Sequence, residues 1–182
     1  MRIPSARVVG SLSVVVLISG FAGSPAAKPP DAPEALRPPA DQVLVLETKT
    51  DKGVQIYECS ASKDQPERFE WVFKAPEAEL FDKSDRKVGK HYAGPTWEST
   101  DGSTVVGEVK AKDAGPDPGA IPWLLLSAKS NSGAGVFSKV KSIQRLQTVG
   151  GKAPSAPCGR DNAQQVVRVP YKAGYYFYAA RQ

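Results

Sequence analysis

Hydrophobic and polar residues alternate with the period of a β-strand in several short stretches of this chain. In residues 68–74, Phe69, Trp71 and Phe73 occupy every second position, which gives the stretch one aromatic face. The chain has 16 Gly and 16 Pro to supply turns. Further short stretches of strand character are residues 43–46, 54–57, 104–109, 123–126, 165–169 and 175–179. The pattern predicts an all-β fold, a single-domain antiparallel sandwich or barrel.

The connections between these stretches are predicted from turn residues. Gly53 ends a turn-like segment, residues 50–53, so residues 43–46 and 54–57 are expected to form a hairpin. Residues 172–174 are expected to separate the last two strands. Residues 123–126 are apolar at every position, which predicts a central strand buried on both faces.

Residues 136–149 fit two structures. Apolar residues recur there every three or four positions, which fits a helix with Lys139, Lys141 and Arg145 on its surface. Many neighbours are β-branched, and Gly133 and Gly135 precede the segment as in a hairpin turn. We favour a strand and keep the helix as the alternative. The two glycines lack the third that a nucleotide-binding loop needs, so no cofactor is expected.

Residues 1–27 have the pattern of a secretory signal peptide. Arg2 and Arg7 precede an apolar run of about 14 residues, and small residues follow it. A bilayer span takes about 20 residues. We therefore predict a cleaved signal, no transmembrane segment after cleavage and a secreted or periplasmic protein, with an uncleaved anchor as the alternative.

Five prolines make residues 28–40 a Pro-rich linker, expected to be an extended, mobile spacer. Residues 41–182 are then one β-rich domain of common size. Its two cysteines, Cys59 and Cys158, predict one disulfide in an oxidising compartment, against a free thiol pair or a metal site. Zinc needs three or four ligands and His91 is the only histidine, so no metal is expected.

Charge is unevenly distributed along the chain. Residues 28–117 hold 13 Lys and Arg against 18 Asp and Glu, whereas residues 118–182 hold 9 against 1. We favour acidic and basic strands interleaved in one sheet. The alternative is a basic face, formed by residues 118–182, that binds an anionic envelope glycan or a phospholipid surface. No recognition motif suggests nucleic acid.

His91 is the main candidate for chemistry, because no other side chain titrates near neutral pH without perturbation. It could act as a general base with Asp101 as its orienter, and Ser103 follows in the same turn. We favour a structural role in which the imidazole hydrogen-bonds a backbone carbonyl or a carboxylate and holds the turn at residues 94–95. Contact with a ligand, without chemistry, is the third interpretation.

Trp97 and Trp123 predict a ligand site of another kind, because a flat aromatic face can stack on a sugar ring. Glu98 and Asp101 would then accept hydrogen bonds from the ligand. In this arrangement His91, Trp97 and Asp101 form a rim and Trp123 forms the floor of one concavity. The alternative, which we weight more heavily, is that both tryptophans are core residues.

Five motifs also carry a family resemblance. They are residues 55–59, 91–103, 121–126, 143–151 and 175–178, including His-x-x-Gly-Pro-Thr-Trp, Ile-Pro-Trp-Leu-Leu-Leu and Ile-Gln-Arg-Leu-x-Thr-x-Gly-Gly. From about Val43 to Ala180 the chain resembles exported bacterial and fungal proteins classed as a domain of unknown function. The resemblance implies no established activity, cofactor or catalytic residue.

Three functions are compatible with these observations. The first is a non-enzymatic exported β-domain that binds a small molecule, glycan or envelope component. The second is a hydrolase with His91 as general base. The third is a structural or stress-protective surface protein without a ligand. A cavity shared by His91, Trp97 and Trp123 would separate the first two from the third.

Overall fold

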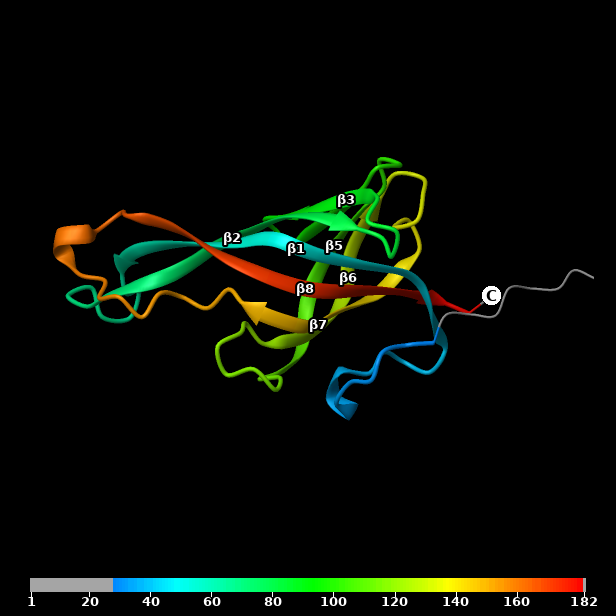
Figure 1. Cartoon of the computed structure of the whole chain (residues 1–182), viewed down its shortest axis with the longest axis horizontal. Coiled ribbons are helices and arrows are strands. Elements are labelled where there is room, and N and C mark those ends of the chain that lie inside the picture. Colours follow the sequence, from blue (N-terminus) through cyan, green and yellow to red (C-terminus); the bar gives the residue numbers. More distant parts are fainter. Residues whose placement is uncertain (1–27, 182) are drawn as a thin grey trace, which may run out of the picture.

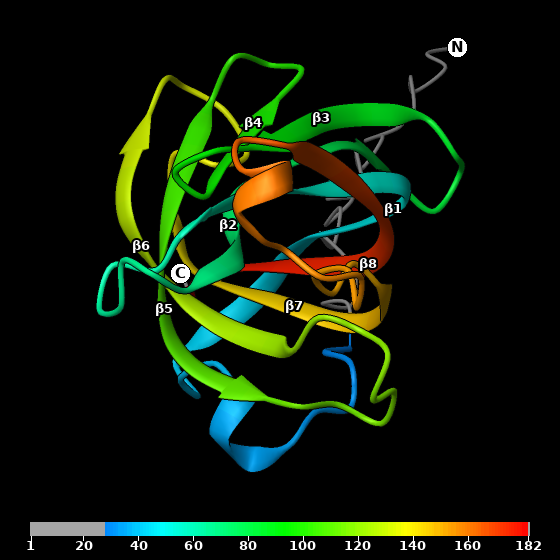
Figure 2. The ribbon, with the colours of Figure 1, turned by 90° about the vertical axis from the view of Figure 1, so that its left-hand side faces the viewer.

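Eight antiparallel strands close into a barrel in the computed structural model, which describes residues 28–181 (Figures 1 and 2). Each strand pairs with the next, and β8 pairs back with β1. The strands are β1 (Gln42–Ala61), β2 (Phe69–Phe81), β3 (Lys87–Tyr92), β4 (Thr96–Ser99), β5 (Thr104–Asp113), β6 (Trp123–Ser132), β7 (Val140–Gly150) and β8 (Val166–Ala180). Two short 3-10 helices, η1 (Glu34–Leu36) and η2 (Arg160–Asn162), complete the described elements. The all-β prediction is confirmed, in its barrel form. The predicted signal peptide lies outside the described residues.

The prediction of a hairpin at residues 50–53 is wrong. β1 continues through this segment, and only its register against β8 shifts between Thr50 and Gly53. Gly53 is needed for a different reason: a Cβ there would lie 2.5 Å from the ring of Tyr171 on β8. A glycine inside a strand often marks such a close approach. The separation expected at residues 172–174 is wrong too, because β8 is also continuous.

Residues 140–150 form β7, so the strand interpretation of this segment is confirmed. On the neighbouring β6, Leu124 pairs with Arg145 and Leu126 pairs with Ile143. Leu126 and Ile143 belong to the main core of the barrel. Since side chains alternate along a strand, Trp123 and Leu125 point to the outer face.

The main core fills one part of the barrel interior with large side chains. Its buried members are Leu80, Trp97, Val105, Ile121, Leu126, Phe137, Val140, Ile143, Tyr171, Ala173, Tyr175 and Phe177. A second cluster contains Leu36, Leu44, Leu146, Tyr176 and Tyr178, with Trp123 and Leu125 packed against it.

The second cluster ties the Pro-rich segment to the barrel. Leu36 of η1 is completely buried. The amide of Gln144 on β7 also donates a hydrogen bond of 2.6 Å to the Leu36 carbonyl. This part of the expected spacer is therefore docked on β5 and β6 and hydrogen-bonded to β7, and it covers outer apolar residues of the sheet.

A disulfide joins Cys59 at the end of β1 to Cys158 in the loop before β8, as predicted. Figure 1 shows β1, β2 and β8 extending toward that loop, which also carries η2. The disulfide fits a protein of an oxidising compartment. Neither of the two helices in the described residues is long or apolar enough to cross a membrane.

Ion pairs connect the acidic and basic halves of the chain within one sheet. Arg168 on β8 pairs with Glu77 on β2, and Lys172 lies 3.7 Å from Asp51 on β1. These contacts support the interleaved interpretation of the charge pattern. All four side chains are about half exposed, so each pair contributes little to stability. Binding of an anionic partner stays a prediction.

Candidate functional site

A cavity of about 480 Å³ enters the barrel at one end. Its wall is mainly apolar and is formed by β1, β2, β5, β6 and β7, the β3–β4 hairpin and the loop before β6. The lining residues are Gln55, Tyr57, Phe73, Lys74, Pro76, His91, Gly94, Pro95, Trp97, Val109, Ile121, Pro122, Leu124, Leu126 and Arg145. The loops after β5 and β7 lie at the end of the barrel that faces the viewer in Figure 2. Small-molecule sites usually have volumes of about 300 to 1,000 Å³ and mainly apolar walls.

His91 and Trp97 form the inner wall of the cavity. They are direct cross-strand partners on β3 and β4, so their side chains lie on the same face of the sheet. Their rings are stacked, with centroids 4.3 Å apart and planes 11° apart. Gly107 on β5 makes room for this pair, because a Cβ there would lie 2.9 Å from the Trp97 ring.

The imidazole of His91 is neutral and fixed in one orientation. Its Nδ1 lies 2.9 Å from the carbonyl oxygen of Thr96, which can only accept a hydrogen bond. Nδ1 therefore carries the proton and Nε2 does not. Burial lowers the pKa of His91 to about 3, and the charge of Arg145 adds to this effect, whereas the Thr96 bond opposes it. Of the two partners predicted for the imidazole, a backbone carbonyl or a carboxylate, the structure has the carbonyl, beside the 94–95 turn.

Arg145 brings a guanidinium group into the cavity wall. Tyr175 of β8 and Leu124 of β6 lie opposite it on the neighbouring strands, on the inner face of the barrel. Its Nε and Nη2 donate to the carbonyl of Pro122 at 3.2 and 2.8 Å. Within residues 28–181, no carboxylate oxygen lies within 4.0 Å of this group. Burial lowers the pKa of Arg145, although it still carries a full charge at neutral pH.

Two further polar atoms of the wall lack partners. The side chains of Gln55 and Trp97 are only 2% and 1% exposed. Neither Gln55 Nε2 nor Trp97 Nε1 has a hydrogen-bond partner among the described residues. Buried donors are almost always satisfied in native proteins, and leaving one unpaired costs about 1 to 3 kcal/mol. Both nitrogens are inaccessible to solvent, so they lie behind the surface of the cavity, and as unpaired donors they lower the stability of the barrel.

Asp101 does not belong to this cavity, so the expected rim of His91, Trp97 and Asp101 is wrong. Asp101 lies in the turn after β4, where it accepts hydrogen bonds from the backbone and hydroxyl of Ser103 at 2.9 and 2.6 Å. It also accepts one from the backbone of Val136 at 2.9 Å. These bonds, led by the Ser103 hydroxyl, lower the pKa of Asp101 to about 2. Asp101 therefore holds two loops together.

Glu98 and Trp123 also lie outside the cavity. Glu98 follows Trp97 on β4 and points to the other face, where it accepts a hydrogen bond from Tyr92 at 2.9 Å and pairs with Lys90 at 3.2 Å. Trp123 packs in the second cluster on the outside of the barrel. The expected floor is wrong because the inward positions of β6 are Leu124 and Leu126. Of the five predicted ligand residues, His91 and Trp97 line the cavity.

Sequence reasoning missed Arg145 and Gln55 as cavity residues. In the helix interpretation Arg145 was placed on the surface, whereas β7 directs it inward beside Ile143, two positions before it. Position parity within the strand was the available signal, since Ile143 and Arg145 share a face. For Gln55, no signal in the sequence marked the inward orientation.

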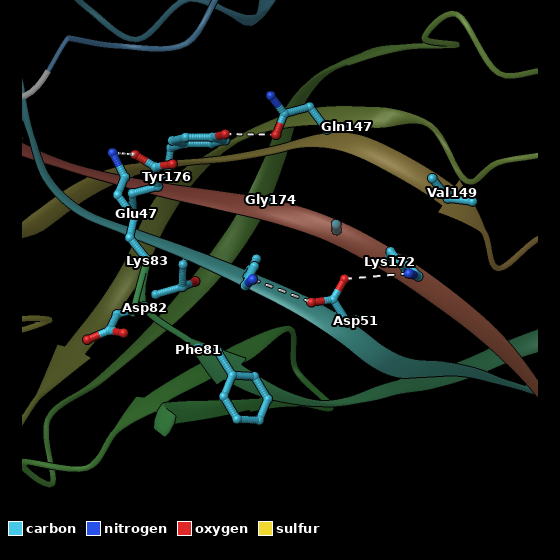
Figure 3. A pocket seen from close by; sticks show the side chains of 13 residues that line it. Glu47, Asp51, Phe81, Asp82, Lys83, Gln147, Val149, Lys172, Gly174 and Tyr176 are labelled. Carbon is cyan, nitrogen blue, oxygen red and sulfur yellow. Dashed lines mark hydrogen bonds and ion pairs between the residues drawn. The ribbon is translucent and has the colours of Figure 1, made fainter. Parts of the chain in front are cut away.

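A second hollow on the outside of the barrel is lined by residues of β1, β7 and β8 and of the end of β2 (Figure 3). Its polar groups are already paired with one another. Lys83 lies 2.8 Å from Glu47, Lys172 lies 3.7 Å from Asp51, and Tyr176 donates to Gln147 at 2.8 Å. Because its charges are neutralised locally, this hollow is a weaker candidate than the cavity at His91.

The described residues contain no group of three or more His, Cys, Asp or Glu side chains that could hold a metal ion. Comparison with curated proteins and with solved structures finds no match. Comparison with protein families matches residues 39–179 to the family described as "Protein of unknown function (DUF3455)". This match covers all eight strands of the barrel except the last residue of β8. The chain belongs to this family.

Proposed function

We propose that this protein is an exported, non-enzymatic β-barrel that binds one small molecule with an apolar body in the cavity lined by His91 and Trp97. The observation that carries the proposal is an open cavity of about 480 Å³ with a mainly apolar wall. Closed barrels of eight strands can enclose one small ligand. The signal-like residues 1–27 and the disulfide support export.

The structure favours a compact apolar ligand over a glycan. One face of the Trp97 ring is covered by His91. Tyr175 and Phe177 meet the same ring edge-on, with ring centroids 5.7 and 6.1 Å from its own. Stacking of a sugar ring needs a free aromatic face. The wall is instead rich in side chains that suit hydrocarbon, such as Leu124 and Leu126.

The hydrolase alternative has no supporting contact. A general base works best when its pKa lies near the working pH. The pKa of His91 is about 3, so its imidazole is a weak base at neutral pH. Its Nδ1 binds a backbone carbonyl, and Asp101 is engaged with Ser103 and Val136.

The experiment compares two valines that are similarly exposed but differently placed. Val109 is 50% exposed and lines the cavity, whereas Val166 is 56% exposed and lies outside it. The probe is N-phenyl-1-naphthylamine, a neutral dye whose emission rises in apolar surroundings. We expect saturable binding of one dye per chain in wild type and in Val166→Trp. Val109→Trp should weaken it at least tenfold because the indole fills the entrance.

Wild-type protein without saturable dye binding would refute the proposal. Equal loss of binding in the two valine variants would place the dye elsewhere and refute it as well. Thermal unfolding of each variant establishes that the barrel is intact.

A further inference from the structure

The protein hydrogen-bonds only one edge of the Arg145 guanidinium group. Nε and Nη2 form one edge of the group, and both donate to the Pro122 carbonyl. Nη1 donates to no atom of residues 28–181, which leaves the end-on edge formed by Nη1 and Nη2 without an acceptor. This edge carries two parallel N–H groups, the geometry that binds a carboxylate through both oxygens.

Arg145 also supplies the unbalanced charge of the cavity. The other cation of the wall, Lys74, lies 3.2 Å from Glu58 and is paired with it. His91 is neutral at neutral pH. A partly buried cation beside leucines is unfavourable unless an anion pairs with it. The described part of the chain places no anion there.

We propose that the natural occupant is a small amphipathic monocarboxylate, with its carboxylate bound end-on by Arg145 and its hydrocarbon body against the apolar wall. This inference rests on the proposed function and adds the chemical class of the ligand.

A carboxylate fits this site better than a phosphate. A carboxylate carries one charge and two oxygens in one plane, which matches one guanidinium edge. A phosphate monoester carries close to two charges and three oxygens at neutral pH. With Lys74 paired, one unpaired cation in the wall balances one negative charge.

The test uses competition against the same neutral dye in the disulfide-intact protein. Decanoate and 1-decanol share a chain length and differ in the head group, and decyl phosphate provides the phosphate comparison. In wild type we expect decanoate to displace the dye at least tenfold better than decanol and better than decyl phosphate. Arg145→Met should bring decanoate and decanol to within about twofold while dye binding persists. The control Lys141→Met, which removes an exposed cation of the same strand outside the cavity, should keep the preference for the acid.

The outcomes separate the two proposals. If the dye binds but acid and alcohol compete equally in wild type, the carboxylate inference fails and the binding function stands. If Arg145→Met keeps the full acid preference, Arg145 is not the head-group site. A preference for decyl phosphate would overturn the choice of carboxylate. If Arg145→Met does not fold, Arg145→Lys replaces it, and we expect it to reduce the preference because an ammonium cannot bind both oxygens in one plane.

Discussion

Trp97→Ala is the substitution that tests most directly how the cavity is built. Trp97 is 1% exposed, belongs to the main core and also forms part of the cavity wall. Its ring stacks on His91 and meets Tyr175 and Phe177 edge-on. The substitution therefore removes packing from the core and enlarges the cavity at the same time.

The expected loss in the free energy of unfolding is about 3 kcal/mol. Truncation of a buried tryptophan to alanine typically costs about 3 to 5 kcal/mol. Two features of Trp97 place it at the low end of this range. Its Nε1 is unpartnered, so removing it relieves a buried donor that costs about 1 to 3 kcal/mol. The space left behind also joins an existing cavity that water can enter.

Trp71→Ala is the matched control, because it removes the same side chain from the same barrel. Trp71 is only partly buried on β2, and its Nε1 donates to the exposed carbonyl of Ala156 at 2.9 Å. Its expected loss is about 1 kcal/mol, the typical contribution of one hydrogen bond. Urea titrations followed by far-ultraviolet circular dichroism measure both variants. Equal losses for the two variants, or a loss below about 1 kcal/mol for Trp97→Ala, would refute a core role for Trp97.

Four further outcomes are expected from urea titrations. Reducing Cys59–Cys158, whose partners are 99 residues apart, should lower the free energy of unfolding by about 4 to 5 kcal/mol; an unchanged midpoint would contradict this. The pKa of His91 is about 3 in the folded protein and 6.5 in the unfolded chain, so its contribution is fully present above pH 6.5 and is lost as the pH falls toward 3. Wild type should therefore lose up to about 1.4 kcal/mol per pH unit more than His91→Gln in this window, and parallel pH profiles would count against it. Asp101→Ala should lose about 1 to 2 kcal/mol without changing dye affinity, because its bonds join two loops outside the cavity; weaker dye binding would contradict the placement. Arg145→Met should stabilise the ligand-free barrel by about 1 kcal/mol, since replacing a buried charge by an apolar side chain is often stabilising, and a clear destabilisation would show that the Pro122 bonds outweigh the charge.

The strands could be predicted because alternation is a local property of the sequence. The choice between barrel and sandwich could not, because it depends on the pairing of β1 with β8 from opposite ends of the chain. The long strands β1 and β8 were divided at Gly53 and at residues 172–174 for a related reason. Gly53 accommodates the ring of Tyr171 on the neighbouring strand, and such a cross-strand contact has no local signature.

For the site too, local features of the sequence could be predicted and contacts between strands could not. His91 and Trp97 were identified because rare side chains were concentrated in one short segment, and their cross-strand pairing placed them together. Trp123 was assigned to the wrong face because residues 123–126 are uniformly apolar and carry no alternation. The helix alternative placed Arg145 on a surface, where a charged residue usually lies, and its inward position follows from its strand partners.

The two ends of the barrel interior have different consequences for the protein. Toward Phe137 and Phe177, whose rings lie 4.6 Å apart, the interior is closed by large apolar side chains that stabilise the fold. At the other end, Arg145, Gln55 and the Trp97 indole leave a charge and two donors without partners, which lowers the stability of the ligand-free protein. A ligand that binds only the folded barrel raises its stability by RT ln(1 + [L]/Kd). Because an amphipathic acid supplies both the missing anion and the hydrocarbon surface, it should raise the melting temperature more than an alcohol of equal length.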